Sequence, residues 1–438
     1  MRHFAFVFAA LLAACATAPA TPINAPVGGA QIAPHERDAG EDLIILALSG
    51  GGARAASFHL GVLQAMRDMR GRDGRPLTDH IALITSVSGG SVFAAYYGLH
   101  GDAGLDTFRA AYLDRTWGVR RGGSPAGVFG ALRGGVNGPH QLADWLDANV
   151  YDHARMSAMN VGPRVVLNST DLFNYTAFAF TPLYFEALCS DLGSVRVGDA
   201  VAASMAAPVA FRPVLAETYP ASCAGPAAWT ERVLADRAAP ENVRATARAF
   251  QNYRGIAPAE QRYLHLSDGG VVDNFGLLSL MVAQAAGPAP APLTAGEALR
   301  ARRVLVLVIN AEYIRPRTFQ RHASDALGVG EAIYSPLDAS TDAAKREAAD
   351  AFRASLPSFA QELRDFRCER AVDARARECD VSVAMDVVTF RDMTPEQYAA
   401  LYATPTDVSL PRATVDAVIA GGRSAIERNA AVATFRAN

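Results

Sequence analysis

Two short apolar runs, each ended by a serine and several glycines, constrain this sequence most. The first covers residues 41–48 (EDLIILAL) and continues into SGGG, and the second covers residues 80–87 (HIALITSV) and continues into SGGS. Apolar runs of this length that end at glycine are typical of buried strands. Each is followed by a segment with helical spacing of apolar residues, at 53–69 and 92–99. Strand, glycine turn and helix in succession predict an α/β fold.

The rest of the chain extends this pattern. We expect an α/β fold around a mostly parallel sheet, with a core at residues 41–312 and a C-terminal extension at 313–438 packed on it. A segment rich in alternating charges, 337–376, predicts solvated helices. Further strands are predicted at 164–167, 263–267, 304–309 and 380–390, and a final helix at 411–429.

The composition excludes several classes of protein. Of the 438 residues 50% are hydrophobic and 19% are charged, which excludes a disordered chain. Five cysteines are too few for a small disulfide scaffold of this length. A formal net charge of -3 gives no basic excess, so no nucleic-acid partner is expected.

The first residues predict export. Arg2 precedes an apolar run at 4–14 that is shorter than the about 20 residues of a membrane-spanning helix, as in a secretory signal peptide. The sequence LAAC that ends at Cys15 resembles the bacterial lipobox. That resemblance implies removal of a lipoprotein signal peptide at residues 1–14 and lipidation of Cys15. The alternative is an ordinary signal peptide with a chance cysteine.

The segment after this cysteine predicts a tether and a location. Residues 15–40 are rich in Ala, Pro, Thr and Gly without a sustained period, which predicts a flexible tether. Residue 16 is Ala rather than Asp. In Gram-negative lipoproteins an Asp there commonly marks inner-membrane retention, so the lipobox resemblance implies an outer-membrane lipoprotein facing the periplasm or the cell surface.

Four cysteines remain after lipidation, an even number that predicts disulfides in an oxidising compartment. Pairing of neighbours in the sequence is the favoured arrangement, and four buried thiols are the alternative. Their spacing lacks the paired CxxC of a zinc site, so no metal is assigned. The favoured pairs are Cys189 with Cys223 and Cys368 with Cys379.

Ser88 is the candidate nucleophile. It lies between a predicted strand and helix, where a sharp turn presents a hydroxyl above the sheet and the helix start offers N–H groups to an oxyanion. The usual pattern is GxSxG, and here Ser86 stands in place of the first glycine. By itself such a turn is a weak signal.

Two further motifs accompany this serine. The glycine loop at 50–52 favours an anion or oxyanion, because its N–H groups sit at a helix start. A P-loop is excluded because no lysine follows, and a dinucleotide-binding GxGxxG does not fit the spacing. Asp268, followed by two glycines at a strand end, is a candidate base, although Asp-Gly is also a common turn.

Together the three motifs resemble those of the patatin-like phospholipases over roughly residues 42–310. That family has an oxyanion loop with an arginine, a serine in GxSxG and an aspartate in DG[GA]. The segments NSTD at 168–171 and AVAASMAAPVAFRP at 200–213 also resemble the family. The SVSGGS turn resembles the related cytosolic phospholipases as well.

The resemblance implies a serine–aspartate dyad on a three-layer α/β/α sandwich related to the α/β hydrolases, without histidine or cofactor. Ser88 would be the nucleophile and Asp268 the base, with N–H groups of Gly50, Gly51, Gly52 and Gly89 facing the oxyanion. Arg54 would stiffen the loop or meet a lipid phosphate, and His59 is expected to be a core histidine. We expect Asp268 to be largely buried, since a carboxylate acts as a base near pH 7 only when its pKa is raised.

Membrane lipids are the implied substrates, as phospholipids, lysophospholipids or other acyl lipids, and the segments 101–160 and 216–262 are candidates for a lid or acyl groove. Alternatives stay open: an inactive envelope lipoprotein that binds lipid or a protein, an acyltransferase, and a conventional esterase or peptidase. A histidine triad in the order Ser, Asp, His would need His322.

Overall fold

The structure is a computed structural model and describes residues 21–28, 35–115, 137–223, 227–255, 261–287, 290–311, 327–370 and 379–437. An eight-stranded sheet in the order β5-β6-β3-β2-β1-β7-β8, with β4 paired to β3, forms its centre. The strands are β1 (Asp42–Leu48), β2 (Ile81–Val87), β3 (Arg164–Asp171), β4 (Thr176–Ala179), β5 (Val214–Glu217), β6 (Tyr263–Asp268), β7 (Arg303–Asn310) and β8 (Ser382–Thr389).

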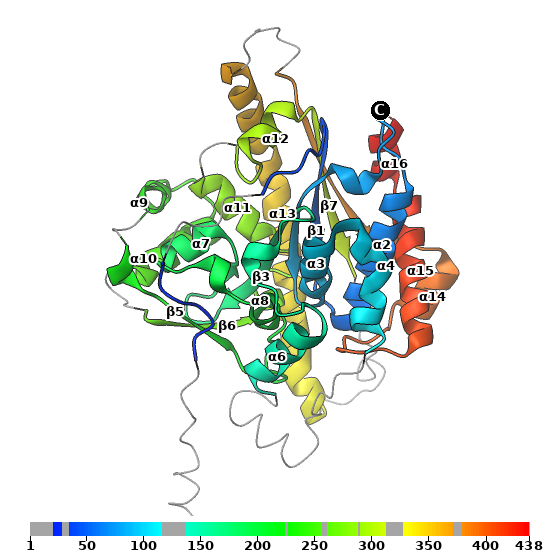
Figure 1. Cartoon of the computed structure of the whole chain (residues 1–438), viewed down its shortest axis with the longest axis horizontal. Coiled ribbons are helices and arrows are strands. Elements are labelled where there is room, and N and C mark those ends of the chain that lie inside the picture. Colours follow the sequence, from blue (N-terminus) through cyan, green and yellow to red (C-terminus); the bar gives the residue numbers. More distant parts are fainter. Residues whose placement is uncertain are drawn as a thin grey trace, which may run out of the picture.

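The middle of the sheet is parallel. β3, β2, β1, β7 and β8 pair in parallel, whereas β4, β5 and β6 are antiparallel additions. β1, β2 and β7 are buried almost throughout, because helices cover both faces of the sheet (Figure 1). The predicted α/β/α sandwich with a mostly parallel sheet is therefore confirmed.

The helices form two layers around this sheet (Figure 1). The α-helices are α2 (Gly52–Asp68), α3 (Gly89–His100), α4 (Gly104–Phe108), α6 (Pro139–Asn149), α7 (Pro182–Ala187), α8 (Val197–Ser204), α9 (Ala228–Ala235), α10 (Glu241–Tyr253), α11 (Leu277–Ala286), α12 (Ala295–Arg300), α13 (Val329–Arg370), α14 (Pro395–Leu401), α15 (Arg412–Arg428) and α16 (Ala430–Ala437). The helices predicted at 53–69, 92–99 and 411–429 correspond to α2, α3 and α15.

The C-terminal extension is part of the core rather than an addition to it. β8 pairs with β7 along its whole length and so widens the central sheet. α15 packs on α2 with the two backbones in contact: a Cβ on Gly61 would lie 2.0 Å from the Ile419 carbonyl oxygen, and one on Gly422 would lie 2.3 Å from that of Phe58. The described part of the C-terminal extension expected at 313–438 thus shares its sheet and its packing with residues 41–312.

α13 corrects the expectation of solvated helices at 337–376. It is one helix of 42 residues with a buried apolar side toward the core. Charged residues cover its other side, and their abundance concealed the apolar spacing in the sequence. The buried residues are Ala348, Phe352, Leu356, Phe359, Leu363 and Phe366.

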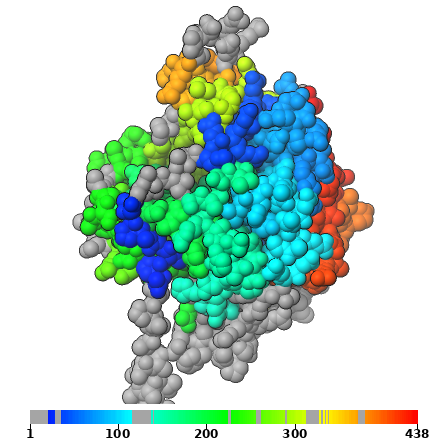
Figure 2. All heavy atoms as spheres, viewed as in Figure 1, coloured from blue at the N-terminus to red at the C-terminus, as the bar shows by residue number. Residues whose placement is uncertain are grey.

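Part of the predicted tether also packs on the core. The Ile23 N–H donates to the Leu215 carbonyl (2.9 Å), and the Val27 N–H donates to that of Cys189 (3.0 Å). The Asn24 amide donates to Ser190 Oγ and to the Glu217 carbonyl, both at 2.8 Å. Figure 2 shows this dark-blue segment on the surface, against green side chains. The expectation of a free tether up to residue 40 is corrected for residues 21–28.

Both expected disulfides are present. Cys189 bonds to Cys223, and Cys368 bonds to Cys379. Over the described ranges, every helix is too short or too polar to cross a bilayer.

Candidate active site

Ser88 occupies a strained turn between β2 and α3. Its φ of 53° and ψ of -123° are uncommon for a residue with a side chain. Such strain persists where the surrounding structure enforces it, and it is typical of a nucleophile presented at a strand-to-helix turn. A Cβ on Gly89 would lie 2.1 Å from the Gly52 carbonyl oxygen. Glycine at position 89 therefore allows the serine turn to touch the glycine loop.

Ser86 fills the place of the missing first glycine without disturbing this turn. It is fully buried at the end of β2, with its Oγ 3.1 Å from Ser91 Oγ and 3.2 Å from the Val166 carbonyl oxygen. A small hydroxyl with hydrogen-bond partners costs little when buried. The departure from GxSxG is accommodated in the strand, and the strained residue remains Ser88.

A second serine supports the turn from below. The Ser88 N–H donates to Ser204 Oγ at the end of α8 (2.8 Å), and the Ser204 hydroxyl donates to the Asn168 carbonyl (2.6 Å). Ser91 Oγ lies 2.9 Å from the same hydroxyl. Ser204 was not predicted as a site residue, although it lies within the segment 200–213 that resembles the family. The Ser88 N–H is therefore already bonded to the Ser204 hydroxyl.

The sheet register brings Asp268 to this serine. Val87 pairs with Asn168 on β3, and Asp268 pairs with the next residue, Ser169. The end of β2 and the end of β6 therefore meet at neighbouring positions of one strand. Asp268 Oδ1 accepts a hydrogen bond from the Gly270 N–H (2.8 Å), and the Ser88 hydroxyl lies close enough to act on the pKa of the Asp268 carboxyl.

Asp268 is buried, as expected for a carboxylate that is to act near neutral pH. It is 9% exposed, and burial raises its pKa to about 6, against the lowering effects of the Gly270 N–H and the Ser88 hydroxyl. Loss of hydration disfavours the charged form of a carboxyl group, which explains the direction of this shift.

The glycine loop offers fewer N–H donors to an oxyanion than the sequence predicts. The Gly50 N–H donates to the Asn274 carbonyl (3.3 Å), which corrects its assignment as an open donor. Gly51 and Gly52 have φ values of 143° and 60°, a backbone region that glycine adopts without strain. Within the described ranges, the N–H groups of Gly51, Gly52 and Gly89 meet no protein acceptor. These three groups remain as donors near Ser88.

Arg54 stiffens the loop and is turned away from solvent. It is 2% exposed and donates to the carbonyls of Ala311 and Thr404 and to Thr406 Oγ1 (2.8 Å). The Ala53 N–H next to it donates to the Asp407 carbonyl (2.7 Å). Of the two roles expected for Arg54, the structure supports bracing, and contact with a lipid phosphate is contradicted by its burial.

Asn274 also lies at the site and was not predicted from the sequence. Besides accepting the Gly50 N–H, it places its Oδ1 2.5 Å from where a Cβ on Gly50 would lie and 2.7 Å from that of Gly270. Asn274 thus bridges the glycine loop and the Asp268 turn. Its position six residues after Asp268 was the signal available in the sequence.

No described histidine contacts the dyad. His59 is a buried core residue whose Nε2 lies 3.3 Å from the Ile309 carbonyl oxygen, and burial lowers its pKa to about 3. His265 is exposed on β6. His322 lies outside the described residues.

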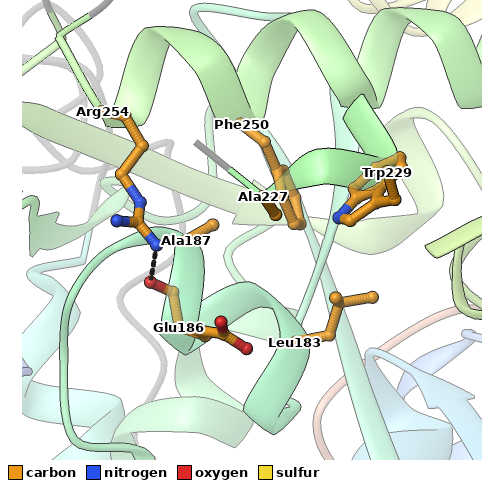
Figure 3. Close-up of a pocket in the computed structure, with 7 residues that line it drawn as sticks. All are labelled: Leu183, Glu186, Ala187, Ala227, Trp229, Phe250 and Arg254. Carbon is orange, nitrogen blue, oxygen red and sulfur yellow. Dashed lines mark hydrogen bonds between the residues drawn. The ribbon is translucent and has the colours of Figure 1, made fainter. Parts of the chain in front are cut away.

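Two cavities lie away from these residues. A small one, of about 10 Å³, lies between α7, α9 and α10, where Arg254 donates to the Glu186 carbonyl beside Phe250 and Trp229 (Figure 3). This volume suffices for about one water molecule. A larger one of about 410 Å³ lies between β7, β8 and α16. Among the described residues no cluster of His, Cys, Asp and Glu could hold a metal ion.

The model of the patatin-like phospholipase family matches residues 46–281, more than half of the chain. The protein belongs to the patatin-like phospholipase family. The match contains the glycine loop, Ser88 and Asp268 and ends before α12, so residues 404–408, which hold the loop, lie beyond the part that this protein shares with the family model.

No curated protein matches the sequence. Among solved structures the chain is similar to human GIVD cytosolic phospholipase A2, with a TM-score of 0.41 and 11% identity over 90% of this chain and 62% of that chain. It is also similar to VipD from Legionella pneumophila, with a TM-score of 0.33 and 12% identity over 94% of this chain and 70% of that chain. The chain spans less than two thirds of the length of the human enzyme, and no argument rests on similarities of this size.

Proposed function

We propose that this protein hydrolyses acyl esters of membrane lipids, phospholipids or lysophospholipids, through Ser88 and Asp268. The observation that carries the proposal is that the sheet register brings a serine in a strained strand-to-helix turn next to a buried carboxylate with a raised pKa. A carboxylate in this state can take a proton near neutral pH.

The reaction runs in two steps. As Ser88 Oγ attacks the acyl carbonyl carbon, its proton passes to Asp268, and the carbonyl oxygen becomes an oxyanion facing the N–H groups of Gly51, Gly52 and Gly89. Each such donor contributes about 3 to 4 kcal/mol to the stability of the transition state in serine hydrolases. The ester bond then breaks, and the departing alcohol oxygen takes the proton from Asp268.

Water completes the cycle. The oxygen of a water molecule attacks the carbonyl carbon of the acyl-serine while Asp268 takes a proton from that water. The proton returns to Ser88 Oγ when the carboxylic acid leaves. The balance needs no metal and no cofactor. No imidazole is required, because the leaving alkoxide of an ester accepts its proton directly from the carboxyl group.

We also propose that Cys15 is lipidated and anchors the enzyme at the outer membrane, facing the periplasm or the cell surface. The LAAC sequence supports this, as do the two disulfides, which form in oxidising compartments. Several acyl chains on one cysteine give stable anchoring, whereas a single chain is marginal.

The experiment is hydrolysis of a phospholipid and a lysophospholipid by the purified mature protein, beside Ser88→Ala and Asp268→Asn. Release of fatty acid by the wild type and its loss in both variants is expected. Full activity of folded Ser88→Ala would refute the dyad. Transfer of the acyl group to an added alcohol in preference to water would identify an acyltransferase.

A further inference from the structure

We propose that the loop at residues 207–210 and the start of α13 face the lipid bilayer, in an orientation set by a short link to Cys15. This inference rests on the lipidation proposed above. It identifies the surface of the enzyme that contacts the membrane in which the substrate lies.

The link is short because the chain is fixed to the core soon after the cysteine. Residues 21–28 contact β5, Ser190 and Cys189 through the hydrogen bonds of Ile23, Asn24 and Val27. Six Cα-to-Cα steps separate Cys15 from Thr21, and a fully extended chain covers about 20 Å over that number. A domain of this length has a radius of gyration of about 22 Å, so its far edge lies out of reach of the membrane.

The link leaves the protein beside the candidate active site. Ile23 bonds to Leu215 and Asn24 bonds to Glu217, so the segment runs parallel to β5, and Thr21 lies toward the beginning of that strand. Figure 1 shows the dark-blue segment next to β5 and β6. The loop 207–210 leads into the same end of β5. The Ala206 carbonyl, just before it, accepts the Asp268 N–H (2.9 Å).

The surface at this edge exposes apolar side chains. Pro208 is exposed, and Val209 is 38% exposed in a left-handed conformation (φ 71°) that β-branched residues rarely adopt. Leu327, 44% exposed, precedes α13. Apolar side chains held outward beside a lipid anchor are suited to the bilayer interface.

The course of α13 places Leu327 at the same edge. Near its C-terminal end, Arg367 donates to the Leu299 carbonyl (2.9 Å), shortly before β7 begins. A helix of 42 residues is about 63 Å long, more than twice the length of an eight-residue strand. Its N-terminal end, in yellow, therefore extends beyond the edge where the parallel strands end and Ser88 lies (Figure 1).

The test is fluorescence quenching on vesicles of phosphatidylethanolamine and phosphatidylglycerol. The lipidated full chain carries Ser88→Ala, which keeps the vesicle lipid intact, and one added cysteine that bears an environment-sensitive dye. Val209→Cys is the test position. Val161→Cys is the matched control, because Val161 is 57% exposed just before β3, at the opposite edge of the sheet.

Lipids with a spin label on the acyl chain should quench the dye at position 209 and leave the dye at position 161 unchanged. Equal quenching at both positions, or quenching at 161 alone, would overturn the orientation while leaving the hydrolase proposal intact. Mass analysis of the N-terminal peptide without lipid on Cys15 would overturn the anchoring proposal and the orientation with it. Neither readout depends on catalysis, so loss of activity is distinguishable from both.

Discussion

The backbone N–H of Ala53, directly after the glycine loop, donates a 2.7 Å hydrogen bond to the carbonyl of Asp407 near the C-terminus. Arg54 adds bonds to the carbonyl of Thr404 and the hydroxyl of Thr406. The segment 404–408 thus holds the glycine loop, although it lies more than 120 residues beyond the end of the family match at residue 281.

Arg54→Met is therefore expected to lower both stability and activity. It leaves buried carbonyl groups without their donor, which costs about 1 to 3 kcal/mol for each group. Urea denaturation and kcat measure the two effects. Thr406→Val removes one bond and should cost about 1 kcal/mol. A stable Arg54→Met enzyme with unchanged kcat would contradict the bracing role.

Gly52→Ala should abolish activity. The added Cβ would lie 2.2 Å from the Asp407 carbonyl oxygen, at a residue whose φ is 60°. Gly74→Ala is the matched control, because Gly74 also has positive φ (82°) and no atom within 4 Å of an added Cβ. The control should lose about 1 to 2 kcal/mol of stability and keep its activity, since it has the backbone strain without the contact. Comparable activity in the two variants would contradict the close approach at residue 52.

Ser204→Ala should lower kcat about tenfold with little change in KM, because the Ser88 N–H loses its acceptor and the turn is less well held. Steady-state kinetics on a soluble ester gives this separation of kcat from KM. Ser204→Thr keeps the hydroxyl and should restore much of the rate. An equally inactive Thr variant with native stability would argue that the hydroxyl is not what positions Ser88.

The pH profile follows from the raised pKa of Asp268. The base acts when ionised, so kcat/KM should rise with pH through about 6 and level off above it. A profile that is flat down to pH 4 would contradict this assignment.

Stability should change with pH in the opposite direction. A carboxyl group whose folded pKa lies above its unfolded value of 3.8 stabilises the fold when protonated, and this contribution is lost as pH rises from about 4 to about 6. The free energy of unfolding of Asp268→Asn, measured by urea denaturation, should thus exceed that of the wild type by up to about 3 kcal/mol at pH 8. The difference should be smaller at pH 4. A variant less stable than the wild type at pH 8 would contradict the burial of a charged Asp268.

The local part of the site was predictable from the sequence. Ser88 and its flanking glycines lie within one strand-turn-helix, and Asp268 lies within one strand and turn, so short-range patterns identify them. The fold class followed from the same apolar runs.

The remaining features depend on contacts between distant segments. Hydrogen bonds join segments that share no sequence pattern. They link Gly50 to Asn274, Ser88 to Ser204 and Ala53 to Asp407. The attachment of residues 21–28 likewise depends on partners near 190 and 215, so their composition indicated a tether. The composition of a segment indicates its local conformational preference, whereas its contacts with the rest of the fold determine whether it is ordered.

The most direct test of the central claim is labelling with a fluorophosphonate, followed by mass analysis of the peptide that carries the adduct. Ser88 Oγ displaces fluoride from phosphorus, as it would attack an acyl carbonyl. We predict an adduct on Ser88 in the wild type, much slower labelling in Asp268→Asn, and none at that position in Ser88→Ala. A folded wild-type protein that remains unlabelled, or an adduct on another residue, would contradict the Ser88–Asp268 dyad.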